Sequence, residues 1–349
     1  MVNLLAHETM KISVVDQSPI FSNSSANKAI TETRELAKYC DSLGLTRFWL
    51  AEHHGSTSFA GCSPEVLIPS LASETESIRI GSGGVMLMHY SPYKVAENFR
   101  LLESLFPNRI DLGLGRAPGS DAFQAGALAY GSKTTGPEFF ATKMNDLKSF
   151  LEGTVSSTES FESVNVTPGL GELPEVWLLV SSRQGAEYAA HFGLPMSLAY
   201  FIDPSCIDLA EVYRDNFQPS IFSKEPKISV GVFSICADTD NEAEELSLSA
   251  AAWRQNSQKG IFGSFPTLQE AKESVNGDLI ATNDNRTFIG APQTVRQKLQ
   301  PILDKVAPEE LKVITICADI EDQIMGLDND ERETFMKEIG LNKTGLTKL

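Results

Sequence analysis

The chain has 349 residues, of which 42% are hydrophobic and 21% charged, and its formal net charge at pH 7 is −17. The acidic residues are spread along the sequence, which argues against nucleic acid or an anionic membrane as a partner, because both bind basic patches. The sequence has no apolar stretch long enough to cross a membrane and no secretion leader over residues 1–8, so we expect a cytoplasmic protein.

Apolar runs typical of buried strands alternate with amphipathic stretches typical of helices along the whole chain. In chain order, strands are predicted at residues 11–16, 47–51, 78–86, 109–114, 175–180, 195–200, 227–237 and 311–317. Helices are predicted at residues 26–43, 64–74, 91–105, 136–152, 182–191, 204–217, 241–255, 292–305 and 330–339. No glycine-rich dinucleotide motif follows an early strand, which argues against an open doubly wound sheet. The pattern therefore indicates an α/β protein, a single (β/α)8 TIM barrel over residues 1–349.

An irregular segment precedes the last predicted strand. Residues 258–286 are rich in Gly, Ser, Asn and Asp, and a connection of this length is unusual in a compact domain. Such loops are either lids or disordered linkers, and we favour a mobile lid over an active site.

Polar residues and glycines lie at the C-terminal ends of several of the predicted strands. In a barrel the C-terminal ends of all strands face one mouth, so residues at these ends are expected to be neighbours. The groups are Asp16-Gln17-Ser18, Glu52-His53-His54, Gly83-Gly84-Val85-Met86, Gly115-Arg116, Ser181-Ser182-Arg183 and Tyr200. We therefore place a candidate active site at this mouth.

The stretch after the fifth predicted strand combines hydroxyl groups with a helix that begins at once. Ser181, Ser182 and Arg183 precede Gly185 at that helix N-terminus, where free N–H groups and the positive end of the helix dipole suit a phosphate. Arg116, after the fourth strand, would complement the same phosphate. The structural alternatives are a serine N-cap with a solvated Arg183, and a salt bridge made by Arg116.

The paired glycines and the paired histidines are unusual within a buried strand. Gly83 and Gly84 weaken a strand, which indicates either a bulge or a flat ligand that lies on the backbone beside Met86. Adjacent strand residues point to opposite faces, so His53 and His54 are poorly placed to bind one metal ion together. We expect no metal site.

Six motifs in this order resemble those of the bacterial-luciferase-like flavin monooxygenases, and in particular their single-chain, non-luminous branch. They are AEHH at 51–54, GSGGVML at 81–87, SPYKVAE at 91–97, DLGLGRAPGSD at 111–121, AAHFGLPM at 189–196 and FIGAP at 288–292. Each motif alone is modestly specific, whereas the ordered set is highly specific.

The resemblance implies a (β/α)8 barrel that binds reduced FMN, which is usually supplied by a separate NAD(P)H:flavin reductase. The flavin reacts with O2, and the resulting C4a-(hydro)peroxyflavin oxygenates a small-molecule substrate such as an aldehyde. The resemblance further implies that His53 serves catalysis and that Gly83 and Gly84 flank a non-proline cis peptide. Arg116 and Ser182 match the phosphate ligands of the family, with help from amides near Gly185. The family also implies a homodimer.

Two positions depart from luciferase itself. Gly115 and Tyr200 stand where luciferase has a cysteine and a tryptophan, which puts light emission and long-chain aldehydes in doubt. Tyr200 and His54 are nevertheless expected at the substrate pocket. Two alternatives remain open, namely a non-catalytic flavin-binding subunit that pairs with an active partner, and a barrel that uses deazaflavin F420.

Overall fold

The strands form a closed parallel barrel in the computed structural model, which describes residues 11–116, 122–154, 161–169, 171–274, 286–306 and 313–317. The strands are β1 (Lys11–Asp16), β2 (Arg47–Leu50), β3 (Arg79–Met86), β4 (Ile110–Gly115), β5 (Glu175–Val180), β6 (Met196–Ala199), β7 (Ile228–Cys236), β8 (Thr287–Gly290) and β9 (Val313–Cys317). Eight of them close a ring in the order β1–β2–β3–β4–β5–β6–β7–β9 and back to β1, and every pairing is parallel. The barrel predicted from the sequence is confirmed.

One strand lies outside the ring, and the sequence analysis missed it. β8 pairs with the C-terminal end of β7, from Phe233 to Cys236. The preceding part of β7 pairs with β6 and β9 instead. Its residues, 287–290, directly follow the segment at 258–286 that was interpreted as an irregular connection, so no strand was predicted there.

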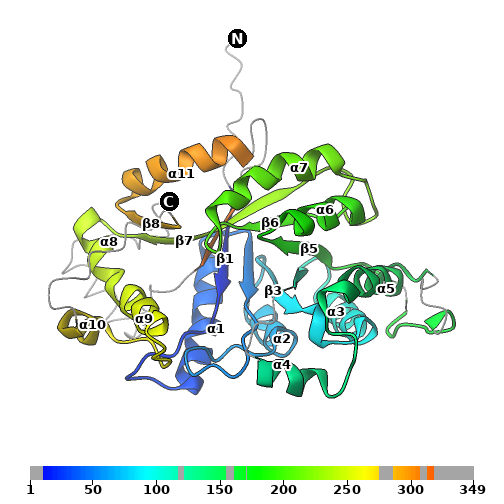
Figure 1. The fold of residues 1–349 in the computed structure, drawn as a ribbon, viewed down its shortest axis with the longest axis horizontal. Coiled ribbons are helices and arrows are strands. Elements are labelled where there is room, and N and C mark those ends of the chain that lie inside the picture. The colour runs from blue at the N-terminus through cyan, green and yellow to red at the C-terminus, as the bar shows by residue number, and fades with distance from the viewer. Residues whose placement is uncertain are drawn as a thin grey trace, which may run out of the picture.

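Helices surround the strands (Figure 1). They are α1 (Ala26–Ser42), α2 (Pro64–Glu74), α3 (Pro92–Leu105), α4 (Ala122–Ala129), α5 (Phe140–Glu152), α6 (Arg183–Phe192), α7 (Leu209–Asn216), α8 (Asp240–Leu246), α9 (Leu248–Gln258), α10 (Leu268–Ser274) and α11 (Pro292–Val306). Single 3-10 turns are η1 (Leu87–His89), η2 (Pro137–Phe139) and η4 (Pro204–Asp208). α4 and α10 were not predicted, and the helix predicted near 330–339 falls outside the described residues.

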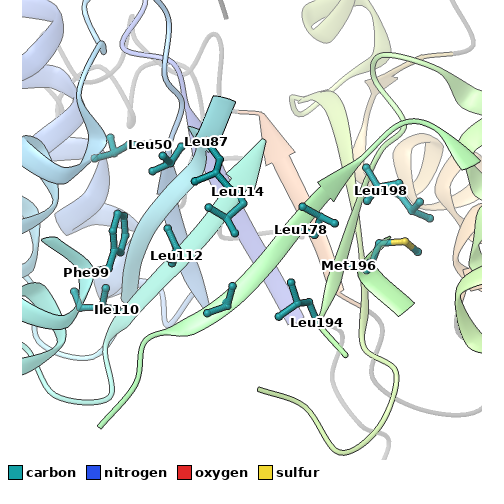
Figure 2. Close-up of a cluster of buried hydrophobic side chains, with 14 of the residues drawn as sticks. Leu50, Leu87, Phe99, Ile110, Leu112, Leu114, Leu178, Leu194, Met196 and Leu198 are labelled. Carbon is teal, nitrogen blue, oxygen red and sulfur yellow. The ribbon is translucent and has the colours of Figure 1, made fainter. Parts of the chain in front are cut away.

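The strand side chains alternate between a layer under the helices and the barrel interior, as the two-residue period of a strand requires. On β4, Ile110, Leu112 and Leu114 belong to the buried hydrophobic layer, together with Phe99 of α3. Figure 2 shows these side chains beside their neighbours from the adjacent strands. The residues between them, beginning with Asp111, have the opposite orientation and face the interior.

An ion-pair network closes the N-terminal end of the barrel. The buried carboxylate of Asp111 accepts hydrogen bonds from Arg47 (2.6 Å), Arg79 (2.7 Å) and the indole of Trp49 (2.9 Å). Arg47 also donates to Glu175 at 3.0 Å. Because this end is filled by paired side chains from β2 to β5, the space inside the barrel is left at the opposite end.

Part of the predicted lid segment, residues 258–286, is described. It includes α10, and the backbone of Phe265 pairs with the loop after β1 through hydrogen bonds with Ile20 and Ser22 (2.8 Å each). The segment is therefore not irregular throughout, which corrects one part of the expectation. Its role as a lid stays a prediction, and residues 275–285 fall outside the described part of the chain.

Candidate active site

A cavity of about 410 Å³ lies at the C-terminal ends of the strands. Its wall gathers residues from the ends of β2, β3, β4 and β5 and from the start of α6. Eight of them were predicted as site residues from the sequence, namely His53, Gly83, Gly84, Met86, Arg116, Ser181, Ser182 and Gly185. Residues far apart in the sequence meet here because parallel barrel strands share one mouth.

One end of the cavity concentrates hydrogen-bond donors. Ser182 is the N-cap residue of α6, and its hydroxyl accepts from the Gly185 N–H at 3.3 Å. Arg116 donates to the same hydroxyl at 3.1 Å and to the side-chain carbonyl of Gln184. A guanidinium, two serine hydroxyls and a helix N-terminus together form a donor set that suits a phosphate group.

Arg183 is not brought into this set. Its side chain is 71% exposed and forms an ion pair with Glu187 at 3.0 Å, one turn further along α6. The prediction that Arg183 binds the cofactor therefore finds no support in its position. The first helical residue after an N-cap projects away from the cavity here, although its neighbour Ser182 lines it.

The glycine pair forms part of the cavity wall and has a packing reason. The peptide bond between Gly83 and Gly84 is cis, as the resemblance implied. A Cβ atom on Gly83 would lie 2.9 Å from Cβ of Trp49, and one on Gly84 would lie 2.7 Å from the carbonyl oxygen of Gly113. Side chains are thus excluded by the neighbouring strands, and bare backbone faces the cavity at this point.

The two histidines have separate surroundings, as their adjacent positions predicted. His53 lines the cavity, and burial, together with the charge of His54, lowers its pKa from 6.5 to about 4. At neutral pH His53 is therefore an uncharged imidazole, which can accept a proton.

His54 lies behind the wall, where the buried carboxyl group of Glu52 orients it. Glu52 accepts hydrogen bonds from the His54 ring at 2.8 Å, from the Tyr90 hydroxyl at 2.7 Å and from the Met86 N–H at 3.2 Å. His54 was expected at the substrate pocket, and it is not among the residues that line the cavity. Burial, and then the charge of Glu52, raise the pKa of Tyr90, so that its hydroxyl remains a donor.

Replacement of Tyr90 by phenylalanine is expected to destabilise the protein by about 1–3 kcal/mol, because the buried carboxyl group of Glu52 loses one of its donors. The free energy of unfolding from urea titration measures this effect. The matched control is Tyr93→Phe, since the Tyr93 hydroxyl donates to the carbonyl of Asn165 at the exposed surface and serves no buried carboxyl group. Equal losses in the two variants would contradict the account of Glu52.

The sequence analysis missed several lining residues. It singled out Tyr200, whose ring packs against Phe288 at a centroid distance of 5.7 Å, whereas the next two residues, Phe201 and Ile202, line the cavity. All three residues lie in the turn after β6, where the alternation of a strand no longer sets the direction of each side chain. Glu52 also lines the cavity, and its signal was its position beside the two histidines.

Two features are absent from the part of the chain that the structure describes, a metal-binding group and a membrane-spanning helix. No group of three or more His, Cys, Asp or Glu side chains in that part of the chain could hold a metal ion. Likewise, none of the helices described above combines the length and apolar character needed to cross a membrane.

Comparison with known proteins adds an independent observation. The model of the luciferase-like monooxygenase family matches residues 10–304. A luciferase-like monooxygenase of Escherichia coli (strain K12) is 34% identical over 320 residues, which cover 88% of this chain and 92% of the relative. An N-acetyl-S-alkylcysteine monooxygenase of Bacillus subtilis is 38% identical over 238 residues, which cover 68% and 70% of the two chains.

Solved structures show the same fold. The crystal structure of apo-MsnO8 superposes with a TM-score of 0.82 at 32% identity and covers 95% of this chain and 99% of its own. At 18% identity, the oxygenating constituent of 3,6-diketocamphane monooxygenase of Pseudomonas putida, in complex with FMN, gives a TM-score of 0.65 and covers 97% and 98%. A coenzyme F420-dependent tetrahydromethanopterin reductase of Methanopyrus kandleri gives 0.57 at 13% identity and covers 88% and 93%.

Proposed function

This chain belongs to the luciferase-like monooxygenase family, and from that premise we propose that it is an FMN-dependent monooxygenase acting on a small organic substrate. The observation that carries the proposal is the coexistence, in one cavity, of the donor set around Arg116 and Ser182 with the uncharged imidazole of His53. Reduced FMN, when bound, supplies the electrons with which O2 is activated. Aldehydes and thioethers are the substrate classes to test first, the latter because of the Bacillus subtilis relative.

The residues present fit a flavin mononucleotide. Arg116, Ser181, Ser182 and the N–H groups at the start of α6 would hold its phosphate, because they concentrate positive charge and donors at one end of the cavity. The bare backbone of Gly83 and Gly84 offers a flat surface for a planar ring system, where side chains would collide with β2 and β4. Apolar side chains, among them Leu179, Phe201 and Ile202, complete the wall.

His53 would hold or move a proton at a ring nitrogen during oxygen transfer. Its low pKa keeps the ring uncharged at neutral pH, so it can accept a proton without first losing one. We assign His54 a supporting role, because its ring is engaged by Glu52.

The remaining expectations are also proposals. We propose that a separate NAD(P)H:flavin reductase supplies reduced FMN, that the protein acts in the cytoplasm and that residues 258–286 shield the cavity. A homodimer is supported by apolar side chains of α2 and α3 that are 52–68% exposed, namely Val66, Leu101 and Leu105. Exposed apolar side chains on neighbouring helices are common at protein interfaces.

Deazaflavin F420 is the second candidate cofactor, because the fold is shared with the F420-dependent reductase. Titration of the purified protein with FMN, reduced FMN and F420, followed by flavin fluorescence, separates the two. We expect saturable binding of FMN or its reduced form and weaker binding of F420. Tight binding of F420 alone would overturn the cofactor proposal. Flavin binding without any oxygenation would instead favour a non-catalytic subunit.

Replacement of Arg116 by alanine is expected to weaken FMN binding about 10- to 100-fold, because a charge-assisted hydrogen bond contributes about 1.5–3 kcal/mol. The Kd from fluorescence titration measures the loss. Arg183→Ala is the control, since the exposed Arg183 pairs with Glu187 outside the cavity. Unchanged affinity in the Arg116 variant would refute the phosphate site, as would a comparable loss in the control.

A further inference from the structure

The ring of His53 is held in an unusual way for a candidate catalytic histidine. Such an imidazole is ordinarily oriented by a hydrogen bond to the nitrogen that does not react. Nδ1 of His53 is buried, but none of the described residues gives it a hydrogen-bond partner. His54, by contrast, is oriented by Glu52 at 2.8 Å. The orientation of His53 must therefore come from packing.

A stacked phenylalanine supplies that packing. The ring of Phe59 lies 4.5 Å from the ring of His53, with an angle of 25° between the two planes. Behind Phe59 lie the edge-on rings of Trp253 and Phe265, each with its centroid 5.6 Å away. Trp253 and Phe265 are themselves stacked at 4.7 Å and 15°. We call Phe59, Trp253 and Phe265 the aromatic column.

The aromatic column joins two parts of the chain that are distant in the sequence. Phe59 follows β2, Trp253 lies in α9 and Phe265 lies between α9 and α10. α9 and α10 lie together on one side of the barrel (Figure 1). Phe59 thus connects His53, which is near it in the sequence, with two rings that come from a distant part of the chain.

Backbone hydrogen bonds fix the rings of the column. Ser58 accepts from the Ile20 N–H, and Ile20 accepts in turn from the Phe265 N–H, both at 2.8 Å. The loop after β1 therefore ties Phe59 and Phe265 together.

Side-chain hydrogen bonds also connect Trp253 with the residue that precedes Phe59. The Trp253 indole donates to the Ser58 hydroxyl at 3.0 Å and to the Gly263 carbonyl at 3.2 Å. The Ser58 hydroxyl donates to the same carbonyl at 2.7 Å. The backbone and the side chain of Ser58 thus both anchor the segment that carries Phe59. The ring of Phe59 contacts the cavity wall through its stack on His53.

We propose that the aromatic column is the positioning element of His53, in which Phe59 sets the plane of the imidazole and shields one of its faces, while Trp253 and Phe265 hold Phe59 in place. The part played by His53 in catalysis rests on the proposed function, whereas its placement by the column does not. Stacking can orient a ring because aromatic rings have preferred relative geometries.

The charged groups near His53 lie outside the column. They are His54 and Glu52 on the same strand end and Arg116 in the same cavity wall. Phe59, Trp253 and Phe265 carry no titratable group, so their effect on the imidazole is through burial. Loss of the Phe59 ring would admit water to one face of His53 and make its charged form less unfavourable.

The test compares Phe59→Leu with Phe59→Tyr. Leucine fills much of the volume but cannot stack, whereas tyrosine keeps the ring. Histidine NMR titration of the protein without cofactor, with His53 assigned from a His53→Asn variant, gives the first measurement. In Phe59→Leu we expect the pKa of His53 to move up from about 4 toward 6.5, and in Phe59→Tyr we expect it to return toward the wild-type value.

Kinetics with reduced FMN give the second measurement. In Phe59→Leu, kcat should fall by about tenfold or more through misplacement of the imidazole. The acid limb of the pH profile should move to higher pH, in step with the NMR titration. Trp253→Phe, which keeps a ring but loses both indole hydrogen bonds, should give a smaller shift in the same direction. The control is Phe161→Leu, since Phe161 packs on Phe150 outside the column.

The outcomes distinguish the placement of His53 by the column from its role in catalysis. An unchanged His53 titration in a folded Phe59→Leu variant would overturn the proposal, and so would a failure of Phe59→Tyr to restore it. If the titration moves while the pH profile does not, the column still positions His53, but the catalytic assignment of His53 fails.

Discussion

Replacement of His53 by alanine is expected to lower kcat by about 10² to 10⁴-fold while the Kd for FMN stays unchanged. A positioned group that transfers a proton contributes an effect of this size. The donor set that would hold the phosphate lies at Arg116 and Ser182, apart from His53, so its affinity is preserved. Steady-state turnover with reduced FMN and fluorescence titration measure the two quantities.

The role of His53 also predicts how the turnover of the wild-type protein changes with pH. Because burial lowers the pKa of His53 to about 4, the proton-accepting form is present at neutral pH and is lost only as the pH falls through that value. Turnover should therefore show no loss attributable to His53 between pH 7 and pH 5. A His53→Ala variant that loses FMN binding together with turnover would make His53 a structural residue instead.

The second large effect is on stability. Replacement of Asp111 by asparagine is expected to cost about 3 kcal/mol of unfolding free energy, because the charges of Arg47 and Arg79 would then face Glu175 alone. The fully buried Asp111 carboxylate accepts hydrogen bonds from Arg47, Arg79 and Trp49 at 2.6–2.9 Å. Urea or thermal unfolding measures the loss.

Glu187→Gln is the matched control for the Asp111 variant. Glu187 forms its ion pair with Arg183 at the surface, where side-chain exposures of 51% and 71% leave the pair screened by water. Surface pairs of this kind contribute at most about 1 kcal/mol. A similar loss in both variants would contradict the assignment of the Asp111 network as the structural closure of the barrel.

The barrel could be predicted because its signal is repeated along the chain. Strands that are buried on both faces give continuous apolar runs, as at residues 176–180, and helices separate the strands. The same repeat located the site, since His53, Gly84, Arg116 and Ser182 each lie near the C-terminal end of a different predicted strand and meet at one mouth. β8 was not predicted because it lies outside the eight-stranded ring, where it pairs with the C-terminal end of β7 and does not belong to the strand–helix repeat.

The remaining site residues could not be predicted because strand and helix ends leave the direction of a side chain undetermined. Tyr200 and Phe201 are adjacent and both aromatic, and only the path of the chain after β6 decides that Phe201 lines the cavity. Arg183 was predicted as a site residue and Gln184 was not, yet Gln184 contacts Arg116 while Arg183 faces solvent. Contacts through Phe59 depend on segments more than a hundred residues apart, which no local pattern reveals.

The central claim, that this protein transfers one oxygen atom from O2 with reduced FMN, is tested most directly by isotope incorporation. Purified protein, reduced FMN and ¹⁸O2 would be incubated with a panel of aldehydes and thioethers, and the masses of the products would be measured by mass spectrometry. The account predicts a product that carries one ¹⁸O atom from the gas and forms only when reduced FMN is present. Substrate turnover that proceeds with reduced F420 and without O2 would contradict it.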